Sequence, residues 1–187
     1  MEFEELTFLF NCGWDNRGQC RLNFDEAALL YKTVKSLDAP RGVEIGRLWG
    51  GSTVLLAAAV GPDGFFSSID VNPQCDEKIG RQLASLGMRD RVRVRTGDSR
   101  TINMPAYDLD FVFIDGDHSY EGVKADQERW GTAVRPGGYV IHHDMTPGDP
   151  DAPNQNGPQR VFYELMAGDE FELVARAGSV AVFQKGG

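Results

Sequence analysis

Apolar positions along this chain recur with two different periods, one typical of helices and one typical of strands. The helical period is clearest over residues 27–37, and Asn23 followed by Glu26 is typical of a helix N-cap with its capping-box partner. Helices are expected over residues 24–38, 52–60, 76–86, 120–133 and 158–166, and short apolar strands over residues 42–46, 65–70, 92–96, 109–115 and 139–144. Strands that alternate with helices predict a parallel sheet covered on both faces.

The last part of the chain departs from this alternation. Residues 171–176 and 180–184 have the composition of strands, and the glycine-containing turn between them predicts an antiparallel hairpin. The predicted fold class is therefore α/β, a single Rossmann-like doubly wound sheet that is mostly parallel and ends in an antiparallel hairpin. Residues 1–40 are expected to form an N-terminal segment and helix that pack on or cover the main domain, residues 41–187. Residues 145–157 are rich in Pro, Gly, Asp and Asn and predict a disordered loop or a lid.

The net charge of the chain bears on whether the protein can bind nucleic acid. Its 187 residues carry a formal net charge of −9, and a surface of that sign repels phosphate backbones. The exception is a run of basic residues that share one face of a predicted strand, which we interpret as a solvated strand end. The run consists of Arg89, Arg91, Arg93 and Arg95. Nucleic acid is therefore not expected as a partner.

The sequence also argues against a membrane protein or an oxidised, secreted protein. The longest apolar run, roughly residues 54–60, is far shorter than the ~20 residues that cross a bilayer. The first five residues include three glutamates, whereas a secretory signal begins with basic residues. Cys12, Cys20 and Cys75 match neither a disulfide framework nor a zinc-binding spacing. We expect a cytosolic protein without a membrane partner.

Acidic residues stand where four successive strands of the predicted sheet end. Asp70, Asp98, Asp115 and Asp144 follow the second to fifth strands in turn. In open α/β sheets, ligands bind beyond the carboxyl ends of the strands, so these side chains should gather at one site. Carboxylates there suit a ligand that carries hydroxyls, an amino group and a positive centre, and they suit a polyphosphate poorly.

A glycine-rich loop follows the first predicted strand. Gly46, Gly50 and Gly51 let the backbone approach a ligand closely and expose amides at a helix start. The spacing does not match the dinucleotide motif G-x-G-x-x-G, because Leu48 occupies the second glycine position. No segment matches the phosphate-binding motif G-x-x-x-x-G-K-[ST] either.

Three segments together resemble a known family, the class I S-adenosylmethionine-dependent methyltransferases. The glycine loop reads VEIGRLWGGST (residues 43–53), which is similar to the E-x-G-x-x-x-G motif of small-molecule O-methyltransferases such as catechol O-methyltransferase. Residues 113–126 read FIDGDHSYEGVKAD and residues 135–144 read RPGGYVIHHD. These two segments resemble a narrower branch, which includes methyltransferases that tailor antibiotics and sugars and cephalosporin hydroxylase-like relatives. The resemblance covers roughly residues 42–184.

The resemblance implies S-adenosylmethionine as the cofactor and a role for each matching residue. The glycine loop would approach the methionine half, and Glu44 would help to hold its amino group or the loop. Asp70 would accept hydrogen bonds from the ribose hydroxyls. Asp98 and Ser99 would flank the adenine, with Asp98 near its exocyclic amine, and Asp115 would lie beside the sulfonium. The implied cofactor-binding residues are Glu44, Gly46, Gly50, Gly51, Ser52, Asp70, Asp98, Ser99 and Asp115.

Three histidines are the candidates for proton transfer. Methyl transfer from a sulfonium is a direct displacement, so the protein mainly aligns the reactants and removes a proton from the acceptor. His118 follows the fourth predicted strand, and His142 and His143 end the fifth. Because neighbouring strand residues point to opposite faces, only one of the latter pair should face the pocket. The expected catalytic residues are His143, His118 and Asp115.

Some relatives bind a divalent cation through the acid that ends the fourth strand and two adjacent residues that end the fifth. The matching positions are Asp115 with either His143 and Asp144 or Asp144 and Met145. The first set mixes oxygen and nitrogen ligands and suits Mg²⁺, Mn²⁺ or a softer metal, whereas Met145 is a poor ligand for a hard cation. The candidate metal ligands are therefore Asp115, His143 and Asp144, with Mg²⁺ as a candidate second cofactor.

The leading interpretation is a small-molecule methyltransferase that acts on oxygen, and a homodimer is expected because the pocket is thinly covered. One alternative is a non-catalytic S-adenosylmethionine-binding or scaffold protein with the same fold, since only about 40 residues precede the sheet. Another is a nicotinamide-dependent oxidoreductase, which conflicts with the glycine spacing.

Overall fold

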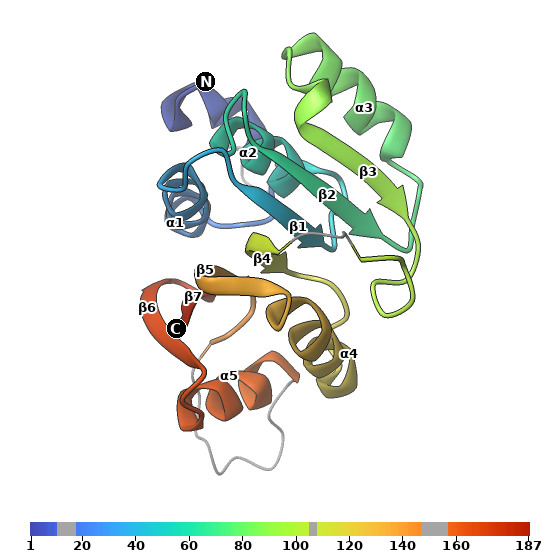
Figure 1. The fold of residues 1–187 in the computed structure, drawn as a ribbon. Coiled ribbons are helices and arrows are strands. Elements are labelled where there is room, and N and C mark those ends of the chain that lie inside the picture. The colour runs from blue at the N-terminus through green and yellow to red at the C-terminus, as the bar shows by residue number, and fades with distance from the viewer. Residues whose placement is uncertain (11–17, 105–107, 147–156) are drawn as a thin grey trace.

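The computed structural model describes residues 1–10, 18–104, 108–146 and 157–187, and they form a seven-stranded sheet with helices on both faces (Figure 1). The strand order is β3-β2-β1-β4-β5-β7-β6, parallel from β3 to β5 and antiparallel in the pairs β5·β7 and β7·β6. The strands are β1 Arg41–Ile45, β2 Phe65–Asp70, β3 Val92–Thr96, β4 Leu109–Ile114, β5 Val134–His142, β6 Phe171–Ala177 and β7 Val180–Lys185. This arrangement confirms the predicted fold class.

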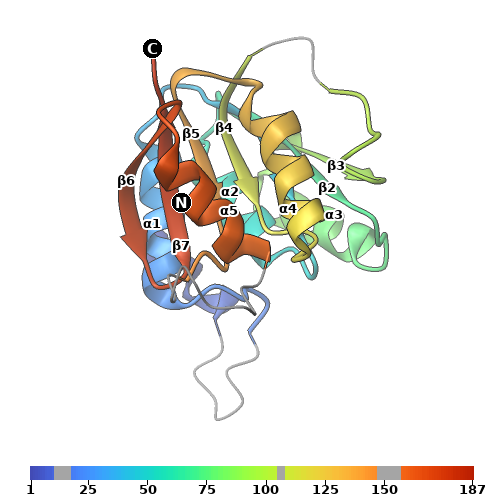
Figure 2. The same cartoon turned by 90° about the horizontal axis from the view of Figure 1, so that it is seen from below.

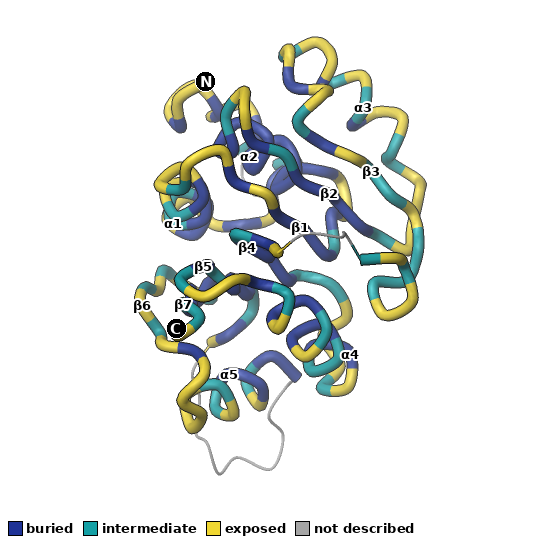
Figure 3. Tube along the Cα trace, in the orientation of Figure 1, coloured by how far each residue is buried: buried dark blue, intermediate teal, exposed yellow. Residues whose placement is uncertain are grey.

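Two helical layers cover the sheet, each with its own apolar cluster. One face carries the helices α1 Phe24–Lys35, α2 Gly51–Ala59 and α3 Asp76–Ser85. The other face carries α4 Tyr120–Asp126, its π-helical continuation Gln127–Gly131 and α5 Gly157–Ala167. Figure 2 shows α4 and α5 side by side on this second face. Buried residues follow the strands and the inner sides of the helices (Figure 3), so the core is formed by the sheet between these layers.

The sheet topology places the ligand site at the carboxyl ends of β1 and β4. From β1 the chain runs outwards through β2 to β3, then returns to β4 on the other side of β1. Such a reversal of strand order opens a crevice at the carboxyl edge of the sheet, because the flanking connections turn away from each other there. Every acidic strand end named from the sequence borders this crevice.

Two predicted elements differ from the structure. The strand predicted over residues 139–144 begins earlier, at Val134, and residues 135–138 are a bulge within β5, which pairs with β4 both before and after them. Gly137 adopts φ +77° there, and Arg135 Nε donates a hydrogen bond to Asp110 of β4. The bulge therefore accommodates the extra residues, and β5 continues beyond them. The helix expected over residues 120–133 is α-helical only to Asp126 and then widens to a π-helical turn.

The N-terminal part of the chain packs against the first layer. A 3-10 helix, Phe3–Leu9, buries Leu6 and Leu9 against α2, and α1 packs on α2 and β6. The predicted capping box of α1 is present, with Asn23 and Glu26 each accepting from the other's backbone amide. Cys12 and most of the predicted loop or lid, residues 147–156, lie outside the described residues. No helix in the described ranges is long and apolar enough to span a bilayer.

Candidate active site

A cavity of about 670 Å³ lies at the carboxyl edge of the sheet. Its volume falls in the range of cavities that hold a small molecule or cofactor. Its walls come from the ends of the parallel strands and from residues 19–22 of the N-terminal segment. The predicted site residues that line it are Gly46, Gly51, Ser52, Asp70, Asp98, Ser99, Asp115, His118, His143 and Asp144. Glu44 and Gly50 do not line it.

The glycine loop is shaped by close contacts beneath it. Gly46 has φ +83°, and a Cβ there would lie 2.0 Å from the backbone oxygen of Asp115. Gly50 has φ +81°, and its Cβ would meet Ile79 of α3 at 2.4 Å. Only glycine fits both positions, so the loop presents bare backbone and the start of α2 to the cavity. Leu48, which also has a positive φ of 46°, is exposed and lines the cavity.

Glu44 supports this loop from inside the protein. Its carboxylate is wholly buried and accepts hydrogen bonds from Thr53 Oγ1 (2.6 Å) and Ser68 Oγ (2.5 Å). Burial raises the pKa of Glu44 to about 7, against the opposing effect of bonds from Ser52, Ser68 and Thr53. Its position favours the second of its two expected roles, holding the loop.

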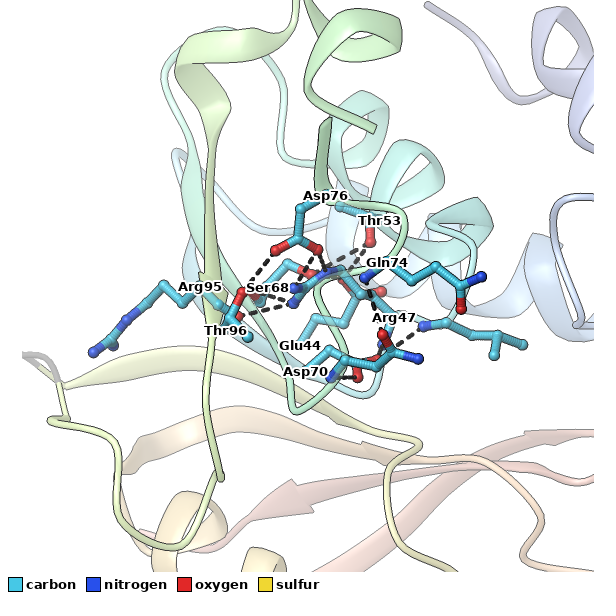
Figure 4. A network of polar contacts seen from close by, with 11 residues as sticks. Glu44, Arg47, Thr53, Ser68, Asp70, Gln74, Asp76, Arg95 and Thr96 are labelled. Atoms are coloured by element: carbon cyan, nitrogen blue, oxygen red, sulfur yellow. Dashed lines mark hydrogen bonds and ion pairs between the residues drawn. The ribbon is translucent and has the colours of Figure 1, made fainter. Parts of the chain in front are cut away.

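Arg47 anchors the loop to the neighbouring elements (Figure 4). Its buried guanidinium donates to Asp76 at the start of α3 and to the backbone oxygens of Ser68 and Arg95. Asp76 also accepts from Thr96 Oγ1 at the end of β3 (2.7 Å). The network therefore joins the loop after β1 to the ends of β2 and β3 and to α3.

Asp70 fixes the other side of the loop. One oxygen, Oδ2, accepts from the backbone amides of Arg47 (2.9 Å) and Leu48 (3.0 Å), and Oδ1 accepts from the amide of Asn72 (2.8 Å). A carboxylate has about four lone-pair positions, so Oδ1 keeps one for a ligand on the cavity side.

Two aspartates border the loop that follows β3, Asp98 within the loop and Asp126 in α4, and their surroundings differ. Asp98 forms a bidentate ion pair with Arg100 (2.7 Å for the closest approach), and these bonds from Arg100 hold its pKa down at about 2. Ser99 donates instead to Asp126 of α4 (2.6 Å), and Trp130 donates to the backbone oxygen of Ser99 (3.2 Å). Asp126 is 2% exposed, yet it lines the cavity.

His143 lies between two carboxylates. Its Nδ1 is 3.0 Å from Asp115 Oδ1, and its Nε2 is 3.6 Å from Oε2 of the buried Glu26. Burial lowers the pKa of His143, but Asp115, Asp144 and Glu26 outweigh that effect and raise it to about 9. At neutral pH the imidazole is therefore protonated, and Nδ1 donates to Asp115. In this state His143 is a cation that orients Asp115 and has no free site to accept a proton.

Asp115, His118 and Asp144 form the cluster with metal-ligating spacing, since one ligand atom from each lies within 4.8 Å of the others. The nitrogens of His118 are 3.6 Å from Asp115 and 3.3 Å from Asp144. Hydrogen bonding to Asp115 raises the pKa of His118, although burial opposes it. The sequence had named His143 as the nitrogen ligand of this site. Its Nδ1 lies 3.0 Å from Asp115 Oδ1 and 3.6 Å from Asp144 Oδ2, and the structure brings His118 to the same carboxylates as a second nitrogen. Asp144 has φ +58°, a strained backbone that is often found at functional sites.

The remaining histidine and methionine candidates point away from the cavity. His142 is wholly buried, lies 2.7 Å from Gln127 Oε1, and has its pKa lowered by burial to about 3. The structure thus places His143 on the cavity and His142 on the opposite face, as strand alternation predicts. Met145 is wholly buried in the apolar cluster of the second face, so the ligand pair of Asp144 and Met145 does not form.

The N-terminal segment contributes to the open side of the cavity. Gln19, Arg21 and Leu22 line it, and Gln19 is held by Trp49 O (3.0 Å) and Gln82 (2.7 Å). The guanidinium of Arg21 stacks on the Trp49 ring, 4.1 Å from its centroid. Trp49 itself is exposed and does not line the cavity.

Sequence reasoning missed three residues that shape the site: Glu26, Arg47 and Asp126. Glu26 had a local signal, the capping box, but nothing in the pattern indicated that it would approach His143. Arg47 stands inside the glycine loop, where its burial follows only from the positions of β3 and α3. Asp126 ends the segment FIDGDHSYEGVKAD and falls in a predicted helix, but nothing in the sequence indicated that its side chain would face the cavity.

Comparison with known proteins agrees with this geometry. Residues 43–145 match a family model described as a methyltransferase domain. The catechol O-methyltransferase of Mycobacterium tuberculosis (strain ATCC 25618 / H37Rv) is 34% identical over 84 residues, which are 44% of this chain and 38% of that protein. The match to this curated relative therefore spans well under half of its length.

Solved structures share the fold over nearly the whole chain. The O-methyltransferase TomG from Streptomyces achromogenes, crystallised with S-adenosylmethionine and involved in tomaymycin synthesis, superposes with a TM-score of 0.71 at 23% identity and covers 99% of this chain and 89% of its own. The O-methyltransferase from Bacillus cereus, crystallised with S-adenosylhomocysteine, has a TM-score of 0.70 at 22% identity and covers 98% and 90%. These two likenesses establish a common fold.

Proposed function

Because this chain belongs to the methyltransferase-domain family, we propose that it transfers the methyl group of S-adenosylmethionine to an oxygen atom of a small molecule. The observation that carries the proposal is the cavity at the carboxyl edge, where a bare glycine loop, a helix start and acidic side chains converge. The catechol O-methyltransferase relative and the two O-methyltransferase structures support oxygen as the atom methylated.

The residues present fit this cofactor. Gly46, Gly51 and Ser52 expose backbone and a helix N-terminus, which suit the polar amino-acid end. Asp70 keeps a lone pair for a ribose hydroxyl. Asp115, whose pKa is lowered by His118 and His143 against the effect of burial, supplies a carboxylate that attracts a sulfonium more strongly than a neutral thioether. When bound, the cofactor supplies the reactive methyl group.

The protein's own residues then align the acceptor and manage its proton. His143, held as a cation between Asp115 and Glu26, keeps the Asp115 carboxylate ionised and oriented. His118 lies half exposed on the acceptor side of the cavity, next to Asp144. Gln19, Arg21 and Leu22 line the same cavity, and we assign to them the exclusion of water, in line with the covering role that we predict for residues 1–40.

Asp115, His118 and Asp144 also fit a divalent cation. Two carboxylates and an imidazole form an oxygen–nitrogen set that accepts Mg²⁺, Mn²⁺ or a softer metal. A cation held there would act as a Lewis acid and lower the pKa of an acceptor hydroxyl. Without a cation, His118 is the residue placed to accept the acceptor's proton.

Transfer of an isotopically labelled methyl group to a panel of small hydroxyl compounds, followed by mass spectrometry, tests the proposal. We expect an O-methylated product from at least one hydroxyl class, and loss of turnover in Asp115→Asn. Cofactor binding without transfer to any acceptor would favour the scaffold alternative instead. A cytosolic location, a homodimer and the absence of nucleic-acid or membrane partners stay predictions from the sequence.

A further inference from the structure

Asp126 is a buried carboxylate that forms part of the cavity wall. It is 2% exposed and lies at the end of α4. Its Oδ1 accepts a hydrogen bond from Ser99 Oγ at 2.6 Å. Within the described ranges, no protein group donates a hydrogen bond to Oδ2. Asp126 therefore presents to the cavity an acceptor that no described residue occupies.

A ligand that fills this part of the cavity displaces water from the acceptor and has to offer a donor in its place. Burial raises the pKa of Asp126, and the bond from Ser99 opposes the rise only in part. The nearby cation, Arg100, is already paired with Asp98 through both carboxylate oxygens. A ligand group that displaces this water without donating a hydrogen bond loses affinity, so the acceptor at the cavity wall favours a donor on the ligand.

The surroundings of Asp126 suit a flat ring. The carboxylate lies between the loop that follows β3 and the loop that follows β4, since Ser99 donates to it and a Cβ on Gly116 would lie 3.5 Å from Asp126 Oδ2. Gly97 lines the cavity at the end of β3, and Gly116 lines it at the end of β4. Neither has a side chain, so the backbone at these two positions leaves room for a flat ring.

We propose that Asp126 Oδ2 accepts a hydrogen bond from the exocyclic amine of the cofactor's adenine. The inference rests on the proposed use of S-adenosylmethionine, and it reassigns to Asp126 the role that the sequence suggested for Asp98. The Asp98 carboxylate is engaged by Arg100 on both oxygens, whereas Asp126 Oδ2 is open. Asp126 would thus determine the preference for adenine over a base that carries a carbonyl oxygen at the same position.

Calorimetry with S-adenosylhomocysteine and S-inosylhomocysteine tests this assignment, because the second ligand replaces the amine with a carbonyl oxygen. The wild-type protein should bind the adenosyl ligand at least about tenfold more tightly. Asp126→Asn keeps the shape and an acceptor for Ser99, but it can turn an amide donor towards the cavity. This variant should lose about tenfold in affinity for the adenosyl ligand and gain affinity for the inosyl ligand.

Asp98→Asn is the matched control and should keep the wild-type preference. A reversed preference in Asp98→Asn, or equal binding of the two ligands by the wild-type protein, would overturn the inference. Should Asp126→Asn fail to fold, Ser99→Ala decides: the acceptor remains, so the adenosyl preference must persist, and its loss contradicts the assignment. Failure of the wild-type protein to bind either ligand would instead refute the proposed cofactor itself.

Discussion

The guanidinium of Arg47 is wholly buried and holds one oxygen of Asp76, with Nε at 2.9 Å and Nη2 at 2.5 Å from Oδ1. This ion pair connects the glycine loop to α3, and Thr96 connects the same carboxylate to β3. The cofactor loop is therefore held by a charge network behind it as well as by its glycines.

Arg47→Met should destabilise the protein by about 3–5 kcal/mol, because it leaves Asp76 without its partner in a largely buried position. Urea unfolding followed by circular dichroism measures the change. Arg81→Met is the control, since Arg81 and Glu77 are paired in an exposed position and the change should stay within about 0.5 kcal/mol. An equal loss of unfolding free energy in the two variants would show that the buried ion pair stabilises the protein no more than the exposed one.

Gly46→Ala should abolish cofactor binding, whereas Gly61→Ala should leave it intact. Both glycines have a positive φ, so each substitution costs roughly 1–2 kcal/mol of backbone strain. At Gly61 nothing lies within 4 Å of the new Cβ, but at Gly46 it meets the Asp115 backbone at 2.0 Å. Binding of S-adenosylhomocysteine and thermal unfolding are measured on both variants. A loss that both variants share reports backbone strain, and a loss confined to Gly46→Ala reports the contact with the Asp115 backbone. Retained binding in Gly46→Ala would mean that the loop can shift.

Removal of divalent cations should lower methyl transfer, and Mg²⁺ or Mn²⁺ should restore it. The reason is the oxygen–nitrogen cluster of Asp115, His118 and Asp144. Calorimetric titration with Mn²⁺ should show binding that is lost in Asp144→Asn. Asp117→Asn should retain it, because Asp117 lines the cavity outside the cluster.

Activity that survives chelation but disappears in His118→Gln would point to His118 as the proton acceptor in a cation-free site. Activity that survives both treatments would contradict either role for this cluster.

Acidification should destabilise the protein partly through His142. Burial lowers its pKa from an ordinary 6.5 to about 3. Between these two pH values the imidazole is protonated in the unfolded chain and neutral in the folded chain. The stability contributed by the neutral form is complete above pH 6.5 and is lost as the pH falls towards 3. At about pH 5 the loss amounts to roughly 2 kcal/mol.

His142→Gln keeps a donor for Gln127 and cannot be protonated in this range. The fall in unfolding free energy between about pH 7 and pH 5 should therefore be smaller in the variant by roughly 2 kcal/mol. Urea unfolding at several pH values measures how the unfolding free energy depends on pH in the wild-type protein and in the variant. The same dependence in both would exclude His142 as a source of acid sensitivity.

The sequence by itself determined the fold class and the edge of the sheet where the site lies. Helix and strand periods, turn residues and the Asn23–Glu26 capping box are local signals, each readable from residues close together in the chain. An acid at the end of a parallel strand must lie at the carboxyl edge, so Asp70, Asp115 and Asp144 were placed without coordinates.

Only the tertiary structure decided which groups meet at that edge and in which charge state. The Asp98 carboxylate binds its neighbour Arg100. Asp126 lines the cavity from a helix on one face of the sheet, and Glu26 contacts His143 from a helix on the other face. Contacts of this kind depend on the direction of side chains and on packing between distant segments, which no local period encodes. The protonated state of His143 follows from the same cause, because its pKa is raised by carboxylates that the fold brings together from different elements.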